Sequence, residues 1–326
     1  MKSFTLLSLF VLLMTLSCKV KKTTTLSAEK PITRPNIIFI MSDDHAYQAI
    51  SAYDATLIQT PNIDRLANEG ILQKAGYQTA MFGKLHFGNN PKGFDEFKIL
   101  PGQGAYYNPR FITQKGDTII DGYVTDITTD LALDWMKNRR DPNKPFLLMY
   151  LHKAPHRAWL PSEKYYKEFT KKTFPLPATL FDDYKTRGTA AKTAEMGILK
   201  HMSLVNDTKL TPATMAKLNL TDWNNLGESL GGMTAEQRAN WDAVYGPINE
   251  DFIEKYPTMN DSTLTVWKYQ RYLQDYLGTI ASVDENVGRV LDYLDEEKLA
   301  KNTIVVYTSD QGFYLGEHGW FDKRFM

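Results

Sequence analysis

The sequence predicts an α/β fold built on a mostly parallel, doubly wound sheet. Three short runs rich in apolar and β-branched residues indicate buried strands, and they cover residues 36–41 (NIIFIM), 145–151 (PFLLMYL) and 303–308 (TIVVYT). Each run ends at polar residues, and helix-like patterns separate the runs. This alternation is typical of a sheet with helices on both faces, whose functional residues collect beyond the carboxyl ends of the strands.

The first 17 residues have the pattern of an export signal. Lys2 precedes a short apolar run that ends at small residues and at Cys18, the single cysteine of the chain. Leu16, Ser17 and Cys18 loosely resemble a bacterial lipobox, although Thr15 stands where an aliphatic residue is usual. We therefore expect a lipid-anchored protein of the periplasm or cell surface, with a polar tether over residues 18–35. Ordinary secretion with an incidental cysteine is the alternative, and neither case allows an internal disulfide.

The remaining elements follow from helical periodicity. Residues 63–69, 127–138 and 269–297 have helical patterns, and the last of these is long enough for more than one helix. From about residue 161 to 265 the pattern weakens, with several prolines and glycines and modest helical pieces such as residues 234–244. We predict that this region is a helical insertion in a catalytic domain over residues 36–326.

Composition favours a large folded unit without a strongly charged partner. The chain has 326 residues, and 43% of them are hydrophobic, which is enough for a sizeable core. Its 38 basic residues balance 38 acidic ones, so no overall field favours nucleic acid or an anionic membrane. We expect no nucleic-acid partner, and membrane contact only through a lipid on Cys18. Any anion must be recognised by a local site.

Carboxylates follow two of the predicted strands. Asp43 and Asp44 come directly after the first strand, and Asp310 and Gln311 follow the third. Adjacent carboxylates repel each other unless a cation or fixed dipoles offset their charge. If the two strands are neighbours, three carboxylates and an amide oxygen converge, a set of hard ligands that suits Ca²⁺ or Mg²⁺. The alternative, that Asp43 or Asp44 merely caps the next helix, is weakened because two pairs occupy equivalent positions.

Basic residues follow the strands in the same way. Lys84 and His86 lie two apart in GKLHFG, so in an extended segment both face the same side. HKAPH places His156 shortly after the second strand, with Pro155 fixing the turn, and Lys323 lies near the end of the chain. Each residue alone would more often be structural or solvated, but two lysines and two histidines beside a divalent cation suit a tetrahedral oxyanion ester. Histidines outside these motifs receive no role: His45, His201 and His318.

The order of these motifs resembles that of the type I sulfatases of the alkaline-phosphatase-like superfamily. The matching segments are PNIIFIMSDDHAYQ, TPNIDRLANEG, AGYQTAMFGKLHFG, HKAPH and NTIVVYTSDQGFYLGEHGWFDKR. The stretch GFDEFKILPGQGAYYNP, from Gly93, is similar to the branch of N-acetylglucosamine-6-sulfatases, which includes mucin-desulfating and heparan-acting enzymes. The resemblance implies an alkaline-phosphatase-like sheet and a hydrolase that acts on sulfuric esters of glycans.

The resemblance also implies a role for each motif residue. The implied calcium ligands are Asp43, Asp44, Asp310 and Gln311, the last standing where asparagine is also common. Lys84 and Lys323 would bind sulfate oxygens and offset charge as the bond from sulfur to the sugar oxygen breaks. His156 would assist protonation of the leaving alcohol, and His86 would help to turn over the covalent intermediate.

One motif implied by the resemblance does not occur in this sequence. Family members attack sulfur with formylglycine hydrate, which is made from the cysteine or serine of a Cys-x-Pro-Ser-Arg or Ser-x-Pro-Ser-Arg motif. That motif is expected between Gly70 and Gln73, and neither form is present. We expect that a strand-and-helix unit on the order of 30 residues is missing there, and that relatives continue past DKRF into a smaller C-terminal sheet.

The missing nucleophile predicts an incomplete catalytic domain. Losing the nucleophile of a concerted site costs on the order of 10⁶ in rate, so we expect the chain as written to have no sulfatase activity. The metal and sulfate residues are all retained, which favours a truncated or misassembled gene over a purposeful pseudoenzyme.

Two other functions stay open at this point. The first is a non-catalytic lipoprotein that binds sulfated glycan through Lys84, Lys323 and the histidines. The second is a phosphoesterase of the same superfamily, which would use two transition metals and a Thr or Ser nucleophile after the first strand. No such nucleophile stands out, and GKLHFG favours sulfate. The sugar, its linkage and the oligomeric state are not determined by the sequence.

Overall fold

The computed structural model describes residues 34–51, 56–64, 77–85, 90–91, 94–222 and 230–323. The expected export signal lies outside the described residues, as do all but the last two positions of the tether, His86, and the junction at Gly70. Within the described ranges, none of the helices has an apolar stretch of the length that a bilayer span requires.

A seven-stranded mixed sheet with the order β5-β4-β3-β2-β6-β1-β7 forms the centre of the described part. Its strands are β1 (Asn36–Ser42), β2 (Gln78–Lys84), β3 (Glu96–Leu100), β4 (Arg110–Thr113), β5 (Gly116–Ile119), β6 (Phe146–His152) and β7 (Thr303–Ser309). The neighbouring strands β3, β2, β6, β1 and β7 pair in parallel. Strands β4 and β5 form an antiparallel hairpin that is added at the β3 edge. The predicted α/β class with a mostly parallel sheet is therefore confirmed.

The three strands predicted from the sequence are confirmed; each ends one residue later than expected, and β6 also begins one residue later. Ser42 of β1 lies opposite His152 of β6 on one side and opposite Ser309 of β7 on the other. Because the strands are parallel and in register, their carboxyl ends meet at one edge of the sheet. This edge is where the motif residues emerge.

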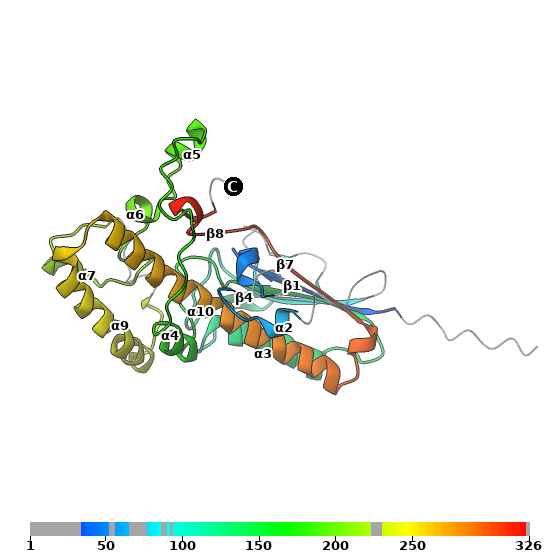
Figure 1. Ribbon diagram of the computed structural model, residues 1–326. Coiled ribbons are helices and arrows are strands. Elements are labelled where there is room, and N and C mark those ends of the chain that lie inside the picture. Colours follow the sequence, from blue (N-terminus) through cyan, green and yellow to red (C-terminus); the bar gives the residue numbers. More distant parts are fainter. Residues whose placement is uncertain are drawn as a thin grey trace, which may run out of the picture. The chain divides into compact units, whose positions relative to one another are not determined.

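Helices α3 and α10 lie along one face of the sheet (Figure 1). Helix α3 (Val124–Asp134) passes into a π-helical turn at Trp135–Arg139, and α10 (Asp261–Glu296) is a single helix of 36 residues. The region predicted over residues 269–297 is thus one helix, which begins at a capping box of Asn260 and Thr263. Apolar side chains of α10 share one core cluster with Ile38 and Ile40 of β1.

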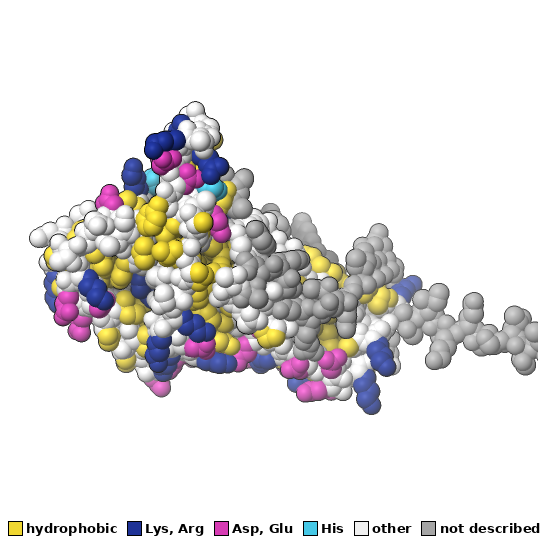
Figure 2. Space-filling view, in the orientation of Figure 1, with side chains coloured by type: hydrophobic (Ala, Val, Ile, Leu, Met, Phe, Trp, Pro, Cys, Tyr) yellow, Lys and Arg dark blue, Asp and Glu magenta, His cyan; other side chains and the backbone are white. Residues whose placement is uncertain are grey.

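The region predicted as an insertion contains several short helices and one long one. They are α4 (Glu163–Phe169), α5 (Thr189–Thr193), α6 (Ile198–His201), α7 (Pro212–Lys217) and α9 (Ala235–Lys255). Helix α9 continues well beyond the predicted end at residue 244, despite Pro247, because Trp241, Tyr245 and Phe252 bury a common stripe. Ion pairs one helical turn apart line its surface, and Figure 2 shows acidic and basic side chains interspersed on that face.

A short helix and a short hairpin also belong to the described part. Helix α2 (Pro61–Asp64) lies at the start of the helix predicted over residues 63–69, whose later positions are outside the described residues. Strands β8 (Tyr314–Leu315) and β9 (Phe321–Asp322) form a hairpin that leads directly into Lys323.

The second face of the sheet carries a smaller apolar cluster made of strand and loop residues. Phe39, Met41 and Met149 are half-buried against it, and no residue of a described helix belongs to it. Strand β1 accordingly alternates between buried and half-buried positions. The apolar sequence of β1, however, has no polar residue at the half-buried positions, and such a run is typical of a strand that is covered on both faces.

Candidate active site

Four neighbouring parallel strands deliver the candidate site residues. Asp43 and Asp44 follow β1, Lys84 ends β2, HKAPH begins with the last residue of β6, and Asp310 begins the segment after β7. A pocket of about 320 Å³ opens at this edge. Its polar lining comprises Asp43, Lys84, Gln103, His152, His156, Asp310, Gln311 and Lys323.

The turn after β1 is held from two sides. Asp44 has a left-handed backbone conformation with φ of 66°, which aspartate tolerates better than most residues. Its N–H donates to Asp310 Oδ1 at 3.1 Å, and its carbonyl accepts from the hydroxyl of Tyr276 on α10 at 2.6 Å. Tyr276 also accepts from the N–H of Ala46 at 2.8 Å. The end of β7 and helix α10 therefore both position the acidic pair.

Ammonium groups contact the two adjacent carboxylates. Lys84 pairs with Asp43, and Lys323 pairs with Asp44 while lying 4.0 Å from Asp43 Oδ1. Gln311 Nε2 donates to Asp44 Oδ1 at 3.2 Å. All predicted site residues that the structure describes thus meet at one place, and only His86 lies outside the described residues.

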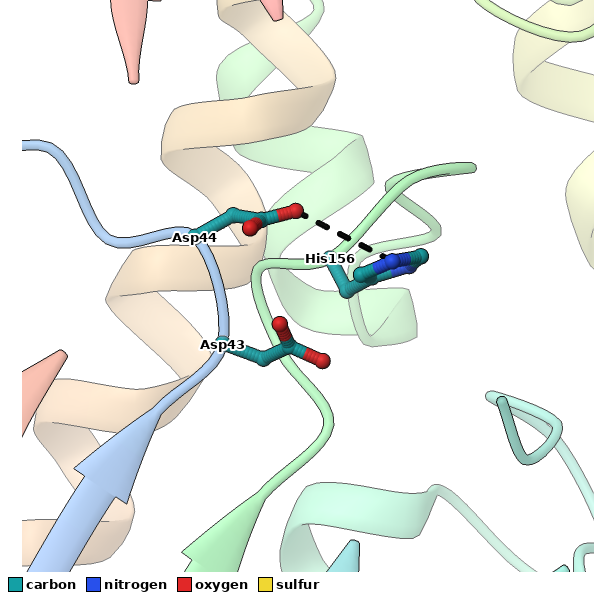
Figure 3. A group of neighbouring side chains, drawn as sticks. All are labelled: Asp43, Asp44 and His156. Carbon is teal, nitrogen blue, oxygen red and sulfur yellow. Dashed lines mark ion pairs between the residues drawn. The ribbon is translucent and has the colours of Figure 1, made fainter. Parts of the chain in front are cut away.

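The carboxylate pair also faces His156. Figure 3 shows Asp43 and Asp44 on the turn after β1, with the imidazole of His156 opposite them. His156 Nε2 lies 3.9 Å from Asp44 Oδ2, and one ligand atom from each of the three residues lies within 4.8 Å of the others. This grouping is compact enough to hold one metal ion.

The electrostatics of the carboxylates fit a hard divalent cation. Burial raises the pKa of Asp43 even though Lys84 opposes the shift. Burial, followed by the charge of Asp43, raises the pKa of Asp44 to about 7 despite contact with Lys323. Asp44 Oδ2 is buried and accepts no hydrogen bond from the described residues. Ca²⁺ takes carboxylate oxygens as ligands, and a bound cation would favour the charged form of both side chains.

His156 is held as a neutral imidazole. Burial, assisted by the charges of Lys153, Lys84 and Lys323, lowers the pKa of His156 to about 2. Its Nδ1 donates to the carbonyl of Arg157 at 2.6 Å, so Nε2 is the unprotonated nitrogen that faces the carboxylates. In this tautomer His156 can accept a proton or bind a cation. The predicted role in protonating a leaving alcohol requires a proton on Nε2.

Sequence reasoning missed several residues that shape the site. Lys153 is buried with its Nζ 4.6 Å from the centroid of the Tyr106 ring, and burial lowers its pKa to about 7. The Tyr106 hydroxyl donates to the carbonyl of His156 at 2.6 Å. His152 and Lys153 belong to the motif HKAPH, so the motif could have indicated that both lie near the site. No motif spacing points to Tyr106 or Tyr276.

The histidines that received no role make structural contacts. His45 is bonded to the Tyr307 hydroxyl at 2.5 Å and to the carbonyl of Ala49 at 2.9 Å. His201 accepts from the N–H of Gly197 at 3.0 Å, and His318 lies 2.6 Å from Asp182.

Comparison with known proteins identifies the family. The sulfatase family profile matches residues 70–324. The chain belongs to the sulfatase family. An N-acetylglucosamine-6-O-sulfatase of Bacteroides thetaiotaomicron is 43% identical to this chain over an alignment of 343 positions, which covers 90% of this chain and 61% of the relative. An iduronate 2-sulfatase of Mus musculus is 27% identical over 196 residues, which cover 60% of this chain and 27% of the relative.

A solved structure extends the comparison to three dimensions. It is described as a complex with its substrate D-glucosamine-2-N,6-O-disulfate, and it matches this chain with a TM-score of 0.81 at 42% identity. The match covers 90% of this chain and 69% of that chain. The sulfatase-like fold implied by the motifs is therefore confirmed.

The alignment with the Bacteroides relative contains gaps in this chain. It runs over 343 positions, whereas 90% of 326 residues is about 293 residues. About 50 aligned positions of the relative therefore have no counterpart in this chain.

Proposed function

We propose that this chain carries the metal and substrate site of a calcium-dependent sulfatase that acts on 6-O-sulfated glucosamine residues of glycans such as heparan or mucin. The observation that carries the proposal is the pairing of Lys84 and Lys323, which both line one pocket, with the adjacent buried carboxylates Asp43 and Asp44. The similarity to an N-acetylglucosamine-6-O-sulfatase, and to a structure whose stated substrate is a 6-O-sulfated glucosamine, supports this substrate class.

Each side chain has a task that its chemistry suits. Lys84 and Lys323 offset the negative charge of the sulfate oxygens, because buried ammonium groups act more strongly on an anion than solvated ones do. His156 presents its unprotonated Nε2 toward the same space, and it would first have to take up a proton there before giving it to the leaving sugar oxygen. The residues that would hold calcium are Asp43, Asp44, Asp310 and Gln311. When bound, Ca²⁺ supplies a fixed positive charge beside the sulfate.

We also propose that the chain as written binds its substrate without turning it over. The sequence contains no formylglycine motif, and about 50 positions of the Bacteroides relative have no counterpart here. The half-buried side chains of Phe39, Met41 and Met149 on the second face of the sheet offer an apolar surface that a missing unit could cover. Losing the nucleophile costs on the order of 10⁶ in rate.

We further propose export and a lipid anchor at Cys18, in the periplasm or at the cell surface. The pattern of the first 18 residues and the location of sulfated glycans outside cells support this proposal. Mass spectrometry of the mature N-terminal peptide tests it, and an unmodified Cys18 peptide would contradict it.

The catalytic proposal is tested by repairing the chain. A segment that bears Cys-x-Pro-Ser-Arg, taken from a relative, is inserted between Ile71 and Gln73, and both versions are produced with the enzyme that matures the cysteine. We expect desulfation of N-acetylglucosamine-6-sulfate only by the repaired version, and calorimetric binding of that sugar by both.

Two results would overturn the proposal. Turnover by the unrepaired chain would refute the account of the nucleophile, and lack of binding by both versions would refute the site itself. Metal analysis distinguishes the sulfatase proposal from the phosphoesterase alternative, because stoichiometric zinc in place of calcium would favour a phosphoesterase.

A further inference from the structure

His152 is a buried histidine in the wall of the candidate pocket. It ends β6, in register with Ser42 at the end of β1, and it lies one position beyond the pair formed by Leu151 and Gly83. Lys84 follows Gly83 and Asp43 follows Ser42. The backbone therefore places His152 between a lysine proposed to bind sulfate and a carboxylate proposed to bind calcium.

The ring of His152 is packed but not hydrogen-bonded. Only 2% of the residue is exposed, and its ring centroid lies 4.3 Å from that of Tyr150. Neither ring nitrogen has a hydrogen-bond partner among the described residues. Buried polar atoms in native proteins are nearly always paired, so each exception requires an explanation.

A matched residue shows that the fold can satisfy a buried histidine. His45 is also 2% exposed, yet both of its nitrogens are bonded, one to the Tyr307 hydroxyl and one to the carbonyl of Ala49. His152 differs because it borders the pocket, so its missing partner can be a ligand that enters there.

We propose that His152 is a further substrate-binding residue of this site, whose imidazole donates a hydrogen bond to an oxygen of the bound sulfate ester. The inference rests on the proposed function. A neutral imidazole has one donor and one acceptor nitrogen. It can therefore donate to a sulfate oxygen beside Lys84 and accept from a hydroxyl of the same sugar. Burial lowers the pKa of His152 to about 3, so the ring is neutral at physiological pH.

The test uses the full chain in calcium-containing buffer and measures affinity and thermal stability together. The probe is N-acetylglucosamine-6-sulfate, titrated by calorimetry, with inorganic sulfate as a second probe. We expect His152→Phe to lose about ten- to hundredfold in affinity for both probes, as is usual for a lost hydrogen bond to a charged group. His152→Gln keeps a donor and an acceptor and should recover most of the affinity.

The melting temperature shows whether the hydrogen-bond partner of His152 is the ligand or another group of the protein. His152→Phe should melt at or above the temperature of the unsubstituted chain, because an apolar ring replaces orphaned polar atoms without breaking a bond. His45→Phe should melt lower, since it leaves the carbonyl of Ala49 unpaired.

Three results would overturn the assignment, and they are distinguishable. Unchanged affinity of His152→Phe shows that the ring does not touch the ligand, while the proposed function stands. A fall in melting temperature like that of His45→Phe assigns His152 a protein partner. Absence of binding by the unsubstituted chain rejects the proposed function and this assignment together.

Discussion

Lys323 links the end of the described chain to the acidic pair after β1. Its ammonium contacts Asp44 and lies 4.0 Å from Asp43 Oδ1, within the pocket. We expect Lys323→Ala to weaken binding of N-acetylglucosamine-6-sulfate by about 1.5–3 kcal/mol, because a charged hydrogen bond to the ester is lost. Calorimetry measures this, with Lys217→Ala on the exposed end of α7 as the control. Equal affinities for the two variants would contradict the role of Lys323.

Asp44 is the residue on which the metal proposal depends most. We expect saturating calcium, at about 100 times its dissociation constant, to stabilise the unsubstituted chain by about 2.7 kcal/mol. Asp44→Asn should lose most of this gain, because the amide removes a charged ligand of similar shape. Thermal unfolding with calcium or a chelator measures the effect, and Asp251→Asn, from an exposed helical ion pair, should keep the full response. A full response by Asp44→Asn would exclude Asp44 as a ligand.

Helix α10 acts on the site through one hydroxyl. Tyr276→Phe removes the bonds to the carbonyl of Asp44 and the N–H of Ala46, leaving two buried backbone groups unpaired at a cost of about 1–3 kcal/mol each. We expect this variant to lose both stability and calcium affinity. Tyr293→Phe is the control, because its hydroxyl donates to the carbonyl of Met136, away from the pocket-lining residues. Similar calcium affinities would show that α10 does not hold the turn.

A buried ion pair joins the segment after β6 to the predicted insertion. Arg157 donates to both carboxylate oxygens of Asp207 at 2.6 and 2.5 Å, and it also lies 3.6 Å from Asp322 of β9. Arg157→Ala leaves the buried Asp207 without this charge, so we expect a loss of about 3–5 kcal/mol in the free energy of unfolding. Urea denaturation measures it.

The comparison variant for this pair is Arg187→Ala. Arg187 also pairs with an aspartate, Asp182, but 43% of its side chain is exposed. Water screens such a pair, and its loss should cost at most about 1 kcal/mol. Equal losses of unfolding free energy for the two arginine variants would show that Arg157 does not join the segment after β6 to the predicted insertion.

At the scale of the whole molecule, the two faces of the sheet are covered unequally by described residues. One face shares a large core with α3 and α10, while the other has half-buried Phe39, Met41 and Met149. We expect the chain as written to bind the dye ANS, which reports exposed apolar surface. Inserting the missing segment should reduce the fluorescence and raise the melting temperature. Equal fluorescence of both versions would mean that the segment does not cover this face.

The sequence by itself determined the class of the fold and the edge of the sheet at which the motif side chains meet. Three apolar runs indicated adjacent parallel strands, and the polar residues after them indicated where the site would lie. This worked because strand periodicity and the residues at strand ends are local properties of the chain. The full lengths of α9 and α10 were less predictable, because tertiary packing carries α9 past Pro247 and keeps α10 a single helix.

Only the tertiary structure decided which side chains meet and which are left without partners. Tyr276 and Tyr106 reach the site from distant segments, so no motif spacing reveals them. His45 and His152 look equivalent as residues after predicted strands, yet both nitrogens of His45 are bonded, whereas those of His152 have no partner among the described residues. The physical reason is that hydrogen bonding and desolvation depend on neighbours in space, which the order of residues along the chain does not specify.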